Sequence, residues 1–343
     1  VLLDTGDSIL LTAAANGTTL VGTYTVGAAD TSSDLTVSSF SIGTVTDSAG
    51  NAMTSTTLPG TNIASGSAII IDTTAPTVIS FTSTTADGSY KSAGTVNITA
   101  TVSETIVSGN TITVTLDTSD NVTLTAAANG TTLVGTYTVS SGDTSSDLNV
   151  SSFSIGTVTD SAGNAMTSTT VPATNIATGS AIVIDNTVPT IISFTSTTAD
   201  GSYKSTGTVN ITATASEAVV SGNTITVTLD TSDNVSLTAA ANGTTLVGTY
   251  TVSSADTSSD LTVSSFSIGT VTDSAGNAMT STAVPATNIA TGSAIVIDTT
   301  APTVISFTSS SDDGLYDDKP GTNNVNITAT ASEAVVSGNT ITV

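Results

Sequence analysis

The sequence predicts an all-β protein built from tandem β-sandwiches that are joined head to tail. Three observations support this prediction. The chain of 343 residues repeats itself every 113 residues, its apolar residues alternate with Thr and Ser, and short turn sequences separate the alternating segments. No segment shows a competing helical periodicity.

The repeat is long enough to be a whole domain rather than one turn of a solenoid. Residues 73–185 and 186–298 differ at eleven of 113 positions, and nearly all of these differences are conservative. Solenoid repeats are shorter, at about 20–50 residues. The sequence therefore predicts a partial module at 1–72, complete modules at 73–185 and 186–298, and a partial module at 299–343.

The first three strands of a complete module are expected at PTVISF (76–81), TVNITATV (95–102) and TITVTL (111–116). The second of these places Val96, Ile98 and Ala100 on one face, with Thr and Asn on the other. This alternation with a period of two is typical of a strand that is buried on one face. Between the first two strands, Asp87-Gly88 is a turn sequence.

The last four strands are expected at NVTLTA (121–126), TLVGTYTV (132–139), SSFSIGTV (151–158) and SAIVID (180–185). Turn sequences separate these strands too, at Ser119-Asp120-Asn121, Asn129-Gly130 and Ala162-Gly163-Asn164. Seven short strands in a module of about 110 residues predict an immunoglobulin-like sandwich.

The charged residues are few and almost all acidic. The chain contains 24 Asp and 3 Glu against 3 Lys, with no Arg, so its net charge is −24. This charge argues against binding to nucleic acid or to an anionic membrane surface. The absence of His and Cys removes the usual general base and thiol nucleophile. We therefore expect no enzymatic activity, no membrane insertion in this segment, and cations as the natural partners.

The carboxylates are expected to gather where one module joins the next. In a sandwich, the loops after the second, fourth and sixth strands lie at the same end as the entry of the chain. In the module 186–298 this places Glu217 and Asp273 beside Asp185, which ends the preceding module. The same spacing places Glu104 and Asp160 beside Asp72. Oxygen ligands in such numbers favour Ca²⁺, which takes about six to eight of them.

A second acidic group is a weaker candidate for metal binding at the opposite end of each complete module. Asp is also common in turns and keeps a Thr-rich surface soluble, so this ordinary role is the alternative for every Asp of the chain. The weaker candidates are Asp87, Asp117, Asp120, Asp143 and Asp147 in the first complete module, and Asp200, Asp230, Asp233, Asp256 and Asp260 in the second.

The chain resembles the bacterial immunoglobulin-like repeats of giant cell-surface adhesins and of long cyanobacterial-type surface proteins. The matching sequences are D-[TN]-T-[AV]-P-T at the seam between modules, FTSTTADGSYK, the Ser-Glu after the second strand, DTSSDL and VTDSAGNAM. The resemblance implies extracellular display, a head-to-tail rod, and calcium at the linkers. The ligands it implies are Asp72, Asp185 and Asp298, with Glu104, Glu217 and Glu333, and with Asp47, Asp160 and Asp273.

The expected function is structural: a stalk or filament segment of a secreted bacterial surface protein, stiffened by calcium and contacting identical neighbouring modules. One alternative is a subunit of a non-covalent filament, in which residues 299–343 of one chain complete residues 1–72 of the next by strand complementation. A second alternative is a carbohydrate-binding module that uses Tyr90 beside Lys91 to bind a surface or matrix polysaccharide.

Overall fold

The computed structural model describes residues 1–343 except 14, 16, 317–323 and 343, and its described part confirms the all-β prediction. The chain divides into two units, Val1–Asn186 and Thr187–Val343. None of the helices in the described residues has the length and apolar character needed to cross a membrane.

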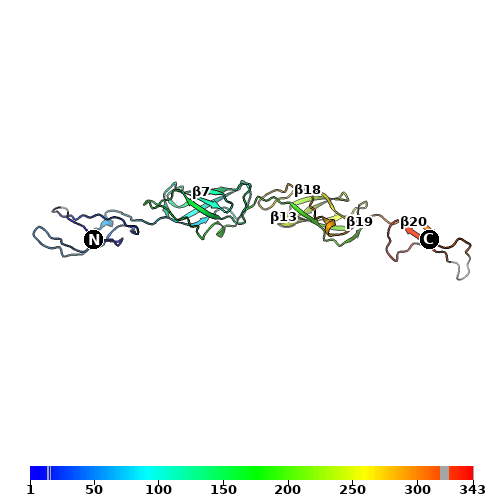
Figure 1. The fold of residues 1–343 in the computed structure, drawn as a ribbon, viewed down its shortest axis with the longest axis horizontal. Helices are drawn as coiled ribbons and strands as arrows, with labels where there is room; N and C mark the ends of the chain where they lie inside the picture. The colour runs from blue at the N-terminus through cyan, green and yellow to red at the C-terminus, as the bar shows by residue number, and fades with distance from the viewer. Residues whose placement is uncertain (14, 16, 317–323, 343) are drawn as a thin grey trace. The chain divides into compact units, whose positions relative to one another are not determined.

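The first unit contains a six-stranded antiparallel sheet, drawn in cyan and green around β7 in Figure 1. Its spatial order is β3-β5-β8-β7-β6-β9. The pair Thr125–Val134 joins β7 to β8, whereas the other neighbours pair over four or more residues. The sheet is thus two three-stranded groups with a narrow junction, which is consistent with a β-sandwich. The strands are β3 (Val78–Thr82), β5 (Thr95–Ile106), β6 (Thr111–Leu116), β7 (Asn121–Thr125), β8 (Gly130–Thr138) and β9 (Val150–Ile155).

The core of this sheet follows the alternation that the sequence shows. Val96, Ile98 and Ala100 are fully buried, and they pack with side chains from both three-stranded groups in one apolar cluster. Phe81 of β3 and Phe153 of β9 meet edge to face, with ring centroids 5.5 Å apart. The core therefore contains side chains from both groups of strands. The burial of these apolar side chains stabilises the packing of the two groups against each other.

One pairing was not expected from the sequence. Beside the six-stranded sheet, β4 (Gly88–Tyr90) pairs in parallel with β10 (Ile182–Ile184), so residues 73–185 contain eight strands rather than seven. The Asp87 carboxylate accepts a hydrogen bond from the Ala181 backbone N–H at 2.9 Å, and the Gly88 N–H donates to the Ala181 carbonyl at 2.9 Å. Because of these bonds, the segment after Asp87, where the sequence predicts a turn, forms a short strand.

The first 72 residues form little regular structure. They contain β1 (Leu2–Leu3), β2 (Val37–Ser39) and the 3₁₀ helix η1 (Ile63–Ser65). Their buried apolar cluster consists of Leu3, Leu35 and Ile71. A second 3₁₀ helix, η2 (Ile176–Thr178), occupies the position of η1 one repeat later.

The second unit repeats the same sheet order, β11-β13-β16-β15-β14-β18, and β12, β19 and β17 form a three-stranded sheet. A separate hairpin pairs β20 with β21. The elements are β11 (Ile191–Thr195), β12 (Gly201–Tyr203), β13 (Thr208–Val219), β14 (Thr224–Leu229), β15 (Asn234–Thr238), β16 (Gly243–Thr251), β17 (Thr257–Ser258), β18 (Val263–Thr270), α1 (Ile289–Gly292), β19 (Ile295–Asp298), β20 (Val304–Ser309) and β21 (Ile327–Ala331).

Candidate metal centre

Three carboxylates of the first unit converge as the sequence predicts. Asp72, Glu104 and Asp160 each offer one oxygen, and these oxygens all lie within 4.8 Å of one another. Oxygens on opposite sides of a Ca²⁺ ion are about 4.6–5.2 Å apart, because each lies about 2.3–2.6 Å from the ion. The spread of the three oxygens therefore fits ligands of a single cation.

The turn after β9 holds Asp160 in place. Asp160 is 3% exposed, and its Oδ1 accepts hydrogen bonds from the backbone N–H groups of Gly163 at 2.7 Å and Asn164 at 2.8 Å. Gly163 has a φ of +97°, a conformation that side chains rarely adopt. Burial raises the pKa of Asp160, but the hydrogen bonds from Asn164 and the turn backbone outweigh it, so the net pKa is lowered. Asp160 therefore stays charged.

Asn164 connects this turn to the seam. Its Nδ2 donates to Asp160 Oδ2 at 2.7 Å and to the backbone carbonyl of Asp72 at 2.9 Å. The Asp72 carboxylate in turn accepts the Thr74 N–H at 3.0 Å. The chain entering β3 is thus bound to the loop after β9, because one amide contacts both the Asp160 carboxylate and the Asp72 backbone.

Glu104 lies within β5, two residues before its end. The sequence predicted a strand ending at Val102 with Glu104 just outside it. The strand instead continues to Ile106, with an irregular register against β8 between Thr101 and Ile106. The Val107 N–H donates to the Thr159 carbonyl at 3.0 Å. This contact ties the end of β5 to the Asp160 loop, and it brings Glu104 to the other two carboxylates.

Glu104 is the carboxylate of this group whose charge is least compensated. Its Oε1 is buried and has no hydrogen-bond partner among the described residues. Burial raises the pKa of Glu104, and the charges of Asp72 and Asp160 raise it further. A buried oxygen that faces two like charges is relieved by a proton or by a cation. The donor set therefore suits a hard cation such as Ca²⁺.

The equivalent residues of the next repeat divide between the two units. Asp185 ends the first unit's repeat, and its N–H donates to the Tyr90 carbonyl at 2.9 Å. In the second unit, Glu217 lies in β13 and Asp273 follows β18. Asp273 is 3% exposed and accepts the Asn277 N–H at 2.8 Å and its Nδ2 at 2.7 Å, as Asp160 does with Asn164.

The remaining implied ligands do not join a group of three carboxylates within the described residues. Asp47 forms the same turn with Asn51, whose N–H and Nδ2 donate to it at 2.8 Å each. Asp298 closes β19 and accepts the Thr300 N–H at 3.0 Å. Glu333 follows β21, and its Oε1 is buried with no hydrogen-bond partner among the residues described.

The weaker acidic group closes loops by hydrogen bonds. Asp117 accepts the Ser145 hydroxyl at 2.6 Å and the Asn149 N–H at 3.1 Å, and the Asp143 carboxylate accepts the Tyr137 hydroxyl at 2.6 Å. No three of these carboxylates converge in the part of the chain that is described. One repeat later, Asp230 and Asp256 accept the same hydroxyl bonds as Asp117 and Asp143. Asp200 accepts a backbone N–H as Asp87 does.

Four carboxylates of the weaker group differ in how much they are satisfied. Asp120 Oδ2, Asp147 Oδ1 and Asp260 Oδ1 are buried and have no hydrogen-bond partner in the described residues. Burial raises the pKa of Asp120, with a further contribution from neighbouring Asp143. Asp233 accepts the Thr231 hydroxyl at 3.2 Å. The group therefore contains carboxylates that hold loops by hydrogen bonds and carboxylates with a buried oxygen that has no partner among the described residues.

Two contacts had no clear signal in the sequence. Tyr137 is buried with its hydroxyl on Asp143, and burial followed by this bond raises the pKa of Tyr137. The recurrence of a Tyr six residues before an Asp in each repeat is the one pattern that could have indicated this contact. The ring of Tyr90, the carbohydrate-platform candidate, packs against the core, and its hydroxyl donates to the Ala86 carbonyl at 2.8 Å.

Asp317 and Asp318 of the last segment lie outside the described residues. Neither a protein-family model nor a curated protein sequence matches this chain.

Proposed function

We propose that this chain is a stalk or filament segment of a secreted, adhesin-type bacterial surface protein. In this proposal 73–185 and 186–298 are immunoglobulin-like modules, and 1–72 and 299–343 are partial ones. Calcium bound at the seams stiffens the array. The observation that carries the proposal is the group Asp72, Glu104 and Asp160, because it combines a seam residue with a strand and a loop of the following repeat.

The position of this group explains how a cation would stiffen a seam. Asp72 belongs to the segment that leads into β3, whereas Glu104 lies in β5 and Asp160 in the turn after β9. A cation shared by the three restricts the torsions of the linking segment, because any swing of the linker pulls Asp72 from its ligand position. In the second unit, Glu217 and Asp273 occupy the repeat positions of Glu104 and Asp160.

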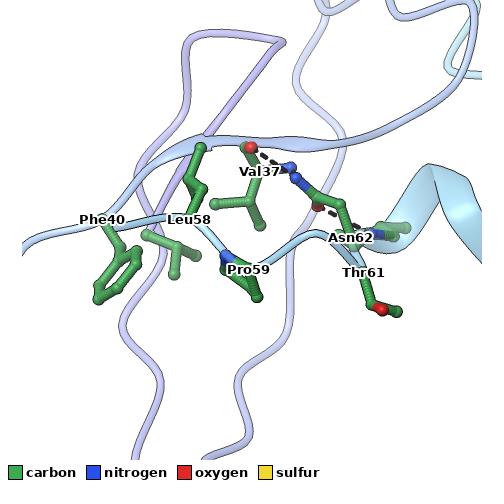
Figure 2. Close-up of a pocket in the computed structure, with 8 residues that line it drawn as sticks. Val37, Phe40, Leu58, Pro59, Thr61 and Asn62 are labelled. Carbon is green, nitrogen blue, oxygen red and sulfur yellow. Dashed lines mark hydrogen bonds between the residues drawn. The ribbon is translucent and has the colours of Figure 1, made fainter. Parts of the chain in front are cut away.

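The near identity of the two complete repeats also favours a structural role. Most differences between the two complete repeats exchange similar residues, such as Val78 for Ile191. The two described pockets, one of which Figure 2 shows, contain no convergent acid–base pair of the kind that hydrolases use. Repeating one module lengthens a stalk without requiring a new fold.

Thermal unfolding of the whole chain with calcium and with a chelator tests the proposal. Calcium is expected to raise the melting temperature, because a ligand held at 100 times its Kd adds about 2.7 kcal/mol of stability to the state that binds it. Glu104→Gln keeps the side-chain size and removes the charge, so it should reduce the calcium response, and the double variant with Glu217→Gln should abolish it.

Asp313→Asn is the matched control, because it removes one negative charge from an exposed residue outside the seam groups. The control should retain the full calcium response. A melting temperature that does not change on chelation, or a response equally lost in the control, would contradict calcium binding at the seams.

A further inference from the structure

One difference between the two complete repeats falls at the exit, the segment in which the chain leaves the last strand of a repeat. The residue that follows the seam Asp is Asn186 at the exit of 73–185 and Thr299 at the exit of 186–298. A side-chain amide carries two donor hydrogens and an acceptor oxygen, whereas a hydroxyl carries one donor hydrogen on a shorter side chain. The first of these exits can therefore be held by more hydrogen bonds than the second.

Asn186 uses this capacity on two loops of the first unit. Its Oδ1 accepts the Ser92 N–H at 2.6 Å, in the loop after β4. Its Nδ2 donates to the carbonyls of Ser140 at 3.0 Å and Asp143 at 2.9 Å, in the turn after β8. One side chain thus makes three hydrogen bonds, and these bonds join the exit to two loops that are far apart in the chain.

The two loops that receive the amide are themselves held by the sandwich. The Tyr137 hydroxyl, from β8, donates to the Asp143 carboxylate at 2.6 Å. In the other loop, the N–H of Ala93 donates to the Val139 carbonyl at 2.9 Å. The bonds of Asn186 therefore end on backbone that is already fixed, which is what a side chain needs in order to hold a segment in place.

Thr299 makes only part of this set of bonds in the second unit. Its Oγ1 donates to the Asp256 carbonyl at 3.0 Å, the counterpart of the bond from Asn186 to Asp143. Within the described residues, no hydrogen bond joins Thr299 to Ser205, which is the counterpart of Ser92. The second exit is thus held to the turn after β16 and lacks the bond to the loop after β12.

The second unit nevertheless keeps the loops that an amide would contact. The Tyr250 hydroxyl donates to Asp256 at 2.5 Å, and Thr206 has a φ of +71° where Ala93 has +70°. The strand that leads to the exit also has the same parallel partner, since β12 pairs with β19 as β4 pairs with β10. The side chain after the seam Asp is therefore what distinguishes the hydrogen bonding of the two exits.

We propose that Asn186 is a clamp that holds the exit of residues 73–185 on the loops after β4 and β8, and that the residue at this position sets how firmly each exit is held. The clamp continues the pairing of β4 with β10, because the Asp185 N–H, one residue earlier, donates to the Tyr90 carbonyl at 2.9 Å. All of these bonds lie within the protein. The inference therefore goes beyond calcium at the seams and does not depend on it.

Hydrogen exchange of the full chain in chelator, measured by mass spectrometry at single-residue resolution, tests the inference. The Ser92 and Ser205 amides both follow Tyr-Lys, so their exchange rates in an unfolded chain are alike. In the unchanged protein, Ser92 should exchange about tenfold more slowly than Ser205, because its hydrogen bond to Asn186 must open first. Asn186→Thr should raise the Ser92 rate to that of Ser205, and Thr299→Asn should lower the Ser205 rate to that of Ser92.

Asn149→Thr is the matched control. It makes the same replacement of an amide by a hydroxyl in the first unit, and the second repeat carries Thr262 at that position. The Asn149 Oδ1 has no hydrogen-bond partner among the described residues, so this variant should leave the Ser92 rate unchanged.

The Thr299→Asn variant keeps the experiment decisive, because damage to the fold cannot slow the exchange of an amide. A Ser205 rate that this variant leaves unchanged would overturn the inference. Equal rates for Ser92 and Ser205 in the unchanged protein would overturn it as well, and so would an Asn186→Thr variant in which Ser92 exchanges no faster than in the control.

Discussion

At the scale of single residues, Asn164 stabilises the seam whereas Glu104 destabilises it in the absence of a cation. Asn164 satisfies both the Asp160 carboxylate and the Asp72 carbonyl, so it stabilises the loop without any ion. Glu104 brings a buried oxygen without a hydrogen-bond partner among the described residues, between two like charges. A frame held by neutral hydrogen bonds can therefore keep an acidic side chain in an unfavourable position, which is what a site awaiting a cation requires.

The raised pKa of Glu104 gives a prediction for stability against pH in the absence of calcium. A carboxyl whose folded pKa lies above its ordinary 4.5 binds a proton more tightly in the folded state, so stability falls as the pH rises above 4.5 through the folded pKa. Glu104→Gln should remove that loss and melt at a higher temperature than the unchanged chain at pH 7. The difference between the two melting curves should shrink below pH 4.5.

Melting in chelator across this pH range checks the prediction. Asp160 does not interfere with it, because the pKa of Asp160 is lowered from 3.8 and its contribution is lost only below that pH. A Glu104→Gln variant that is less stable than the unchanged chain at pH 7 would contradict it.

At the scale of elements, the close approach of β7 and β8 depends on a residue without a side chain. A Cβ on Gly135 would lie 2.5 Å from the Thr123 carbonyl oxygen, and the contact is with backbone that cannot turn aside. The Thr125–Val134 pair next to it is the junction of the two groups of strands. Gly22 and Gly248 have the same surroundings. A glycine in the interior of a strand here allows two backbones to approach closely.

Gly135→Ala should therefore destabilise the first unit by about 1–3 kcal/mol, the usual cost of inserting atoms into a packed site. Gly142→Ala is the matched control, since nothing lies within 4 Å of its added Cβ and the next repeat carries Ala255 at that position. Urea unfolding of the two variants measures the difference. Equal stability of both would show that β7 and β8 separate without cost.

Much of the element structure could be predicted because it depends on local pattern. The alternation through Val96, Ile98 and Ala100 identifies the buried face of β5 without reference to any other strand. Strand order then predicts that Asp72, Glu104 and Asp160 meet, because chain reversals alternate between the two ends of a sandwich. The convergence of these three residues is what the described structure has.

Most of the features that the sequence did not predict depend on partners that are distant in the chain. The β4–β10 pairing depends on Asp87 reaching Ala181, 94 residues away, and neither residue signals the other. The continuation of β5 past Val102 depends on an irregular register against β8, which no alternation pattern contains. The Tyr137–Asp143 bond is short in sequence, but it requires a buried carboxylate that composition alone does not favour.

At the scale of the whole molecule, the distribution of charge is the dominant property. A net charge of −24 on 343 residues means that almost every ionised group repels its neighbours, and folding brings these groups closer together. Each complete repeat contains one Lys against eight acidic residues. Small cations are thus the main source of neutralisation, whether they bind at sites or remain in the surrounding solution.

The chain should therefore become more stable as salt is added, even in chelator. Screening shortens the range of repulsion to about 3 Å at 1 M salt, which relieves the folded state more than the extended one. We expect the melting temperature to rise with NaCl concentration and to rise less in the Glu104→Gln/Glu217→Gln variant. A melting temperature that falls with NaCl would show that attractive ion pairs, and not repulsion, dominate the folded state.

The parallel pairing of β4 with β10 has a mechanical consequence. β10 ends one residue before Asp185, so tension carried along the chain from that side pulls the strand lengthwise past β4. Under such sliding, the pairs Ile182–Gly88, Val183–Ser89 and Ile184–Tyr90 share the force and break together, rather than peeling apart one at a time. The second unit repeats the pairing between β12 and β19. Each complete repeat thus has a latch at its exit that resists traction along the chain.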